Sequence, residues 1–214
     1  MSEAYKIGST DLTSVITHLQ RIDGNIAVAP QLQDDYLVPG RTGAIAATPW
    51  NGPRVITFGG IVAGATRAAY HQALKDLGKL VLNGGQTFTL SRTLATTGTP
   101  THTATARYLG GLEQVEALSN RVGRVAFDVQ LMDGYFYDQT YTTLGTVTAS
   151  GTVTALGEAP TQDVTVTYSI GAGTQRVSNA AFPGLGRLTL VPGSNVLTLT
   201  GGGNVVLSYK AAWL

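Results

Sequence analysis

The stretch of this chain most similar to a catalytic or nucleotide-binding motif is rich in glycine. Gly59 to Thr66 reads Gly-Gly-Ile-Val-Ala-Gly-Ala-Thr, which has the glycine spacing of a phosphate-binding loop between a strand and a helix. Such loops need a lysine that reaches the phosphates, and Ala65 stands at that position. We therefore expect no nucleotide site, and we predict instead a strand bulge at Gly59-Gly60 and a tight turn at Gly64.

Other residue types that support catalysis occur in patterns that do not favour it. His18, His71 and His102 include no pair with metal-ligand spacing, and the Gly-x-Ser-x-Gly signature of serine hydrolases is absent. The chain has no Cys, so thiolate chemistry and disulfides are excluded. The few carboxylates stand mostly beside turns, and a glycosidase pair brought together by folding stays open without support. The sequence predicts a protein that is not an enzyme and has no cofactor or metal.

Aromatic residues are a separate kind of candidate site. Tyr135-Phe136-Tyr137 and Tyr141 resemble a stacking platform, but Asp133 and Asp138 accompany them, whereas nucleic-acid platforms carry Lys or Arg. We expect this group to pack at a domain junction. The other candidates for a ligand or an interface are Tyr209 and Trp213, although Trp213 also suits a terminal strand that must be tied down.

The composition limits the classes of partner. Charged residues make up 13% of the 214 residues, against about 25% in ordinary globular domains. Such a surface suits a protein whose faces are covered by neighbours, or equally a small β-rich domain solubilised by threonine. A formal charge of +1 and a pI near 8.0 do not steer the chain to nucleic acid or to an acidic membrane. We find no signal peptide and no apolar run of the ~20 residues that span a bilayer, and expect the chain to be made in the cytoplasm.

The first part of the chain is arranged around a strand, a helix and a second strand between Gly52 and Arg92. Thr66 is a good N-cap residue, and the helix is predicted over about 66–82, because apolar residues recur there at steps of three and four. Asn83-Gly84-Gly85 is expected to end it. The stripe predicted to cover a sheet consists of Ala69, Ala73, Leu74, Leu77, Leu80 and Val81.

Strands are predicted for most of the remaining chain. Gln31 to Tyr36 is polar and acidic and is followed by Val38-Pro39-Gly40-Arg41, which indicates an exposed loop or an extended hairpin arm. Arg124 to Leu131 alternates as an amphipathic strand, whereas Leu112 to Ser119 is expected to be a loop containing a turn of helix.

Beyond Asp138 no helix is readable, and threonine, glycine and valine dominate. Gly145 to Ala149 recurs as Gly151 to Ala155, which we interpret as a strand at a domain junction. Val196 to Thr200 and Val205 to Trp213 are expected to close the chain as a hairpin. The fold class predicted is mainly β, with a sandwich-like N-terminal domain over 1–140 that carries one α-helix, and a β-sandwich over 141–214.

Three segments in this order resemble the distal tail protein family of long-tailed phages with flexible tails. They are Pro30 to Gly43, Arg54 to Arg92, and the run from Val191-Pro192-Gly193-Ser194-Asn195 to Leu214, which resembles the closing strands of a galectin-like domain. Gly157-Glu158-Ala159-Pro160 similarly resembles the turn before that domain's central strands.

The resemblance implies a structural virion protein at the tail tip. Six copies would form a ring that joins the tail-tube protein to the baseplate hub, with DNA passing through the lumen without specific binding. The N-terminal domain would build the ring, and the galectin-like domain would project outward. The arm to the neighbouring subunit would then include Gln31, Gln33, Asp34, Asp35, Tyr36 and Arg41.

Two other functions stay open at this point. A tail-tube subunit is also a hexameric β-sandwich with one helix, but it must polymerise. A carbohydrate-binding or receptor-binding module would depend on the C-terminal sandwich, with Tyr209 or Trp213 at its site.

Overall fold

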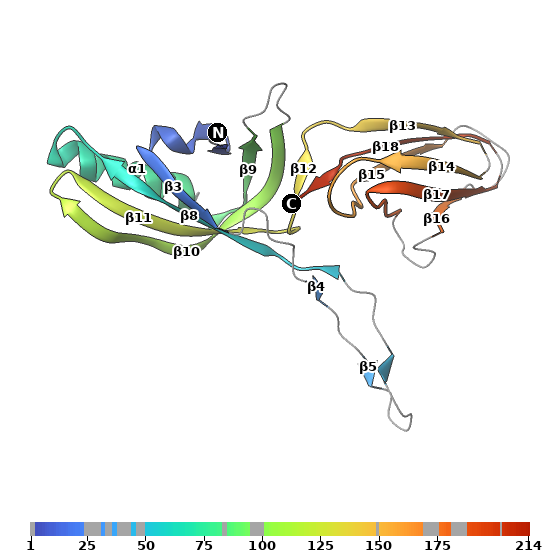
Figure 1. Ribbon diagram of the computed structural model, residues 1–214, viewed down its shortest axis with the longest axis horizontal. Helices are drawn as coiled ribbons and strands as arrows, with labels where there is room; N and C mark the ends of the chain where they lie inside the picture. Colours follow the sequence, from blue (N-terminus) through green and yellow to red (C-terminus); the bar gives the residue numbers. More distant parts are fainter. Residues whose placement is uncertain are drawn as a thin grey trace. The chain divides into compact units, whose positions relative to one another are not determined.

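The computed structural model describes residues 3–23, 31–32, 36–37, 44–45, 50–82, 85–94, 101–148, 150–168, 176–180, 188–201 and 203–214. The chain divides into two compact units, Met1–Tyr135 with Leu214, and Phe136–Trp213 (Figure 1). Strands dominate both units, and one α-helix is present in the described part of the chain. The predicted mainly-β fold class with one helix is therefore confirmed.

The N-terminal unit is built on one antiparallel sheet with strand order β2-β1-β9-β10-β11-β8-β3. Its strands are β1 (Ala4–Ile7), β2 (Thr10–Asp11), β3 (His18–Asp23), β8 (Arg54–Ala63), β9 (Phe88–Thr93), β10 (Thr101–Ser119) and β11 (Val122–Leu131), and a 3-10 turn spans Leu12–Ser14. Buried residues alternate along β8 and β11, as the period of two requires for a half-buried sheet.

The sheet curls so that its inner face closes on itself. The Tyr5 ring of β1 lies edge-on to Phe58 of β8, with 5.2 Å between centroids, although three strands separate β1 from β8 in the sheet order. Phe58 in turn stacks on Phe127 of β11 at 5.4 Å. These rings form the core of the unit, and each is almost fully buried.

Helix α1 (Arg67–Leu82) contacts β8 and β10. The Thr66 side chain accepts a hydrogen bond from the Ala69 N–H at 3.1 Å, as the N-cap prediction requires. Leu77 and Val81 are buried as predicted, but the stripe is wrong at its start. Tyr70 is buried where the sequence favoured Ala69, because the steps from Tyr70 to Leu77 and Val81 keep these three side chains on one face.

Two local predictions in this unit are wrong. Leu112 to Ser119 belongs to β10, which pairs with β11 as far as Ser119. The strand β8 runs straight through Gly59 and Gly60, and the register shift lies in its partner β3 between Leu19 and Arg21. A Cβ on Gly60 would lie 2.5 Å from the His18 carbonyl oxygen, so glycine is needed there for close approach of the bulged strand.

Four short strands follow β3 in the chain. They are β4 (Gln31–Leu32), β5 (Tyr36–Leu37), β6 (Ala44–Ile45) and β7 (Trp50–Asn51). β4 pairs with β7 and β5 pairs with β6, both antiparallel.

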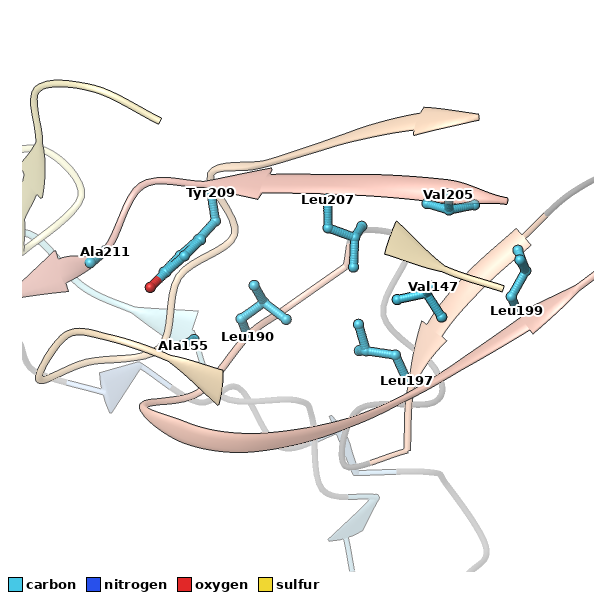
Figure 2. Close-up of a cluster of buried hydrophobic side chains, with 9 residues drawn as sticks. All are labelled: Val147, Ala155, Leu190, Leu197, Leu199, Val205, Leu207, Tyr209 and Ala211. Atoms are coloured by element: carbon cyan, nitrogen blue, oxygen red, sulfur yellow. The ribbon is translucent and has the colours of Figure 1, made fainter. Parts of the chain in front are cut away.

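The C-terminal unit is a sandwich of two three-stranded sheets, ordered β13-β18-β15 and β14-β17-β16. The strands of the unit are β12 (Phe136–Asp138), β13 (Thr142–Val147), β14 (Ser150–Ala155), β15 (Val164–Tyr168), β16 (Arg176–Asn179), β17 (Gly193–Thr200), β18 (Val205–Tyr209) and β19 (Ala212–Trp213). Figure 2 shows the buried cluster between the sheets, which consists of Val147, Ala155, Leu190, Leu197, Leu199, Val205, Leu207, Tyr209 and Ala211.

This arrangement corrects two predictions for the C-terminal half. The last long strands, β17 and β18, do not form a hairpin but lie in opposite sheets, because both direct leucines into the shared core. Gly145 to Val147 of the first Gly-Thr-Val-Thr-Ala copy lie in β13, and the second copy, Gly151 to Ala155, lies in β14. The described parts of the repeat therefore belong to opposite sheets and not to a single junction strand.

Candidate interaction sites

The predicted arm has the backbone of an antiparallel hairpin where it is described. Gln31 is paired with Asn51, and Tyr36 is paired with Ile45. Four of the six predicted interface residues, Gln33, Asp34, Asp35 and Arg41, lie outside the described residues. The structure thus places Gln31 and Tyr36 on two successive ladders between β3 and β8, and their role at an interface stays a prediction.

The two predicted ligand aromatics are held inside the C-terminal unit. Tyr209 is only 1% exposed, and its hydroxyl accepts a hydrogen bond from the Leu156 N–H at 2.6 Å. Trp213 is partly buried, and its Nε1–H donates to Asp138 Oδ1 at 2.7 Å, where β19 pairs with β12. Tyr209 therefore belongs to the core, and no face of its ring is open to an external ligand.

The glycine-rich loop packs against the start of the helix. A Cβ on Gly64 would lie 2.3 Å from the backbone N of Tyr70, so the first turn of α1 packs directly on this glycine. The Gly64 N–H donates to the Arg121 carbonyl at 2.9 Å, which ties the loop to the turn between β10 and β11. The sequence predicted a tight turn at Gly64, and the chain bends directly after it, at Ala65 and Thr66.

The histidines lie apart from one another. His18 and His71 are exposed, and His71 receives a long hydrogen bond of 3.4 Å from Arg67 Nε. His102 is buried on the inner face of the sheet. Within the described ranges no group of three His, Cys, Asp or Glu side chains could hold a metal ion, and no helix there is long and apolar enough to cross a membrane.

A buried polar cluster on the inner face of the sheet was not predicted. We name the inner polar cluster as Tyr5, Arg54, Arg92, His102 and Tyr135, each at most 4% exposed. Tyr5, Arg92 and His102 are direct cross-strand partners on β1, β9 and β10. The alternation of buried and exposed residues along a strand could have revealed both arginines. Arg92 stands an even number of residues from the buried Phe88 and Leu90, and Arg54 stands likewise to Ile56 and Phe58, so each points to the buried face.

The electrostatics of this cluster follow from burial. Desolvation and the positive charge of Arg92 lower the pKa of Arg54 from its ordinary value to about 10. Burial raises the pKa of Tyr5, and the hydrogen bond from its hydroxyl to Glu3 Oε2 at 2.6 Å raises it further. Burial also raises the pKa of Tyr135. The cluster therefore holds neutral tyrosines beside two arginines. Because the pKa values of these groups differ from their ordinary values, the stability of the unit changes with pH in the alkaline range.

Comparison with solved structures gives a likeness that covers the whole chain. The crystal structure of the Dit protein of phage SPP1, described as a paradigm of the hub adsorption apparatus in phages infecting Gram-positive bacteria, matches with a TM-score of 0.65. The two sequences are 17% identical, and the match covers 98% of this chain and 99% of that chain.

Two structures of the activated phage p2 baseplate, with strontium and with calcium, match less well. Their TM-scores are 0.45 and 0.44 at 16% identity, and this chain covers 55% of the length of each matched chain. No protein-family model and no curated protein sequence matches the chain. The chain has the fold of the SPP1 Dit protein along nearly its whole length.

Proposed function

We propose that this chain is a distal tail protein of a long-tailed phage, a structural component of the tail tip without catalytic activity. The observation that carries this proposal is the likeness to SPP1 Dit, because it includes both units of the chain and leaves almost none of either protein unmatched. A tail component would be assembled in the host cytoplasm and end in the virion.

The ring is the next part of the proposal. Six copies would form a closed ring between the tail-tube protein and the baseplate hub, so each copy would bury two different patches against its neighbours. Permanent interfaces of this kind bury over ~2,000 Å², and a charged fraction of 13% suits surfaces that are covered in this way. A formal charge of +1 suits a lumen through which DNA must slide.

We assign the contact with the neighbouring copy to the arm between β3 and β8. Its described part consists of two ladders of two residue pairs each. Isolated two-stranded hairpins are at best marginally stable in water, so an arm of this kind gains stability when it lies against another surface. The contact residues would be Gln31, Gln33, Asp34, Asp35, Tyr36 and Arg41.

A shortened arm tests this proposal. In the variant, residues 33–49 are replaced by a short glycine-containing turn that joins β4 to β7. We expect light scattering to give six times the 22.3 kDa chain mass for the native protein and the mass of one chain for the variant. The melting transition of the N-terminal unit should persist, because the sheet core is outside the removed segment.

A native protein that is monomeric at every concentration would contradict the ring, and a hexameric variant would contradict the role of the arm. Filaments in the native sample would instead favour a tail-tube subunit.

A further inference from the structure

The C-terminal unit contains a hollow that the proposed structural role does not use. It has a volume of about 310 Å³ and lies along the start of β15, beside Leu188. Its polar lining comes from Tyr141, Gln162, Asp163 and Thr165, and its apolar lining includes Val166 and Leu188. We name it the Tyr141 hollow.

Tyr141 is exposed and yet held in place. Its ring is 48% exposed, while its hydroxyl donates to Asp163 Oδ1 at 2.6 Å and the Lys210 Nζ lies 4.9 Å from the ring centroid. The bond to Asp163 raises the pKa of Tyr141, partly offset by a hydrogen bond with Thr165, so the hydroxyl stays protonated and keeps donating. Ordering an exposed ring costs side-chain entropy with little burial in return, and such an ordered ring is ready for an external ligand.

Asp163 is held in place beside Tyr141. Its backbone N–H donates to Thr161 Oγ1 at 3.2 Å, and its carbonyl accepts from the Lys210 N–H at 3.0 Å. Oδ1 is used by Tyr141, which leaves Oδ2 available as an acceptor. The neighbouring Gln162 is exposed and adds an amide with both donors and an acceptor.

The chemistry of this lining selects one class of ligand. Planar carboxylate and amide groups match pairs of adjacent hydroxyls, and an aromatic ring with aliphatic neighbours matches the C–H face of a sugar. The carboxylate of Asp163 disfavours phosphates and other anions. Among the described residues no arginine or lysine is part of the lining, and the nearby Lys210 Nζ lies over the Tyr141 ring. A volume of about 310 Å³ is at the small end of ligand pockets and suits one ring.

We propose that the Tyr141 hollow binds one neutral pyranose unit of a glycan. Asp163 Oδ2 and the Gln162 amide accept and donate hydrogen bonds to its hydroxyls, while the Tyr141 ring, Val166 and Leu188 contact its carbon face. This site is separate from Tyr209 and Trp213, and it adds glycan binding to the structural role.

The test uses the full-length chain and four simple probes, the methyl glycosides of glucose, galactose, mannose and N-acetylglucosamine. Saturation-transfer NMR should show binding of at least one of them with a Kd of about 1 mM, as expected for a small one-ring ligand. Tyr141→Ala and Asp163→Ala should each weaken that binding by about tenfold. The matched control is Tyr168→Ala, which removes a tyrosine that is 44% exposed on β15 and does not line the hollow, and it should leave binding unchanged.

Unchanged melting of all three variants would show that each loss of binding is local. Failure of all four probes to bind the native chain would overturn the proposal. Binding that survives Tyr141→Ala would overturn it as well, because the sugar would then lie elsewhere.

Discussion

At the scale of single residues, two glycines determine how closely the elements of the N-terminal unit approach. Gly60 admits the backbone of β3, and Gly64 admits the first turn of α1. Both belong to the stretch whose glycine spacing resembles a phosphate-binding loop. The structure gives each a steric role, since a side chain would meet backbone atoms that have no room to move.

The Gly64 contact gives a direct stability prediction. Gly64→Ala should destabilise the N-terminal unit by about 1–3 kcal/mol or more, because its Cβ would overlap the backbone of Tyr70. The matched control is Gly151→Ala in β14, where nothing lies within 4 Å of the added carbon, and this change should stay within about 0.5 kcal/mol. Urea unfolding of both variants measures the difference, and equal midpoints would contradict the close packing of α1 on Gly64.

Tyr5 gives a prediction about pH. Its pKa is raised in the folded state, so above pH ~10 the unfolded tyrosine loses a proton that the folded one keeps, and the stability it contributes falls as the pH rises. Arg54 acts in the opposite direction above pH ~10, because its folded pKa is lowered. In Tyr5→Phe the fall of stability above pH ~10 should become less steep by up to about 1.4 kcal/mol per pH unit.

Comparing the native chain with Tyr5→Phe cancels most of the Arg54 and Tyr135 contributions, since both residues are present in both chains. At neutral pH the variant should lose about 1.5–3 kcal/mol, the usual value of one hydrogen bond to a carboxylate such as that of Glu3. Urea unfolding between pH 8 and pH 11 measures both effects, and parallel pH profiles would show that Tyr5 ionises normally in the folded chain.

At the scale of elements, local sequence patterns predicted the features that depend only on residues close together in the chain. The helix, the alternation of Arg124 to Leu131 and the Thr66 cap are encoded in periodicity and capping chemistry, and all are present. Pairing partners are not encoded locally. Val196 to Thr200 and Val205 to Tyr209 satisfy every local rule for a hairpin, yet they face each other across a core. The Tyr141 hollow could not be predicted from the sequence for the same reason, because Asp163 and Tyr141 come into contact only when the chain folds.

A substitution in α1 tests whether the buried face of the helix packs against the sheet. Leu77 is fully buried at the centre of α1, so Leu77→Asp should unfold the N-terminal unit by placing a charge in the apolar contact with the sheet. Lys75→Asp, two residues earlier on the exposed side, is the matched control and should leave most of the stability intact. Circular dichroism melting distinguishes them, and an unchanged transition for Leu77→Asp would contradict the packing of α1.

At the scale of the whole molecule, the fold of both units follows that of SPP1 Dit at 17% identity. A sequence this divergent keeps the fold because the curled sheet and the sandwich need only alternation and volume, which many sequences supply. The proposed assembly concerns the surface, and a charged fraction of 13% suits faces that neighbouring chains would cover.

Negative-stain imaging of the purified native chain shows whether it assembles into the proposed ring. We expect closed rings with sixfold symmetry and a central opening, formed by identical copies in head-to-tail contact. Fields of isolated single particles at every concentration, with light scattering at the mass of one chain, would contradict the proposed ring.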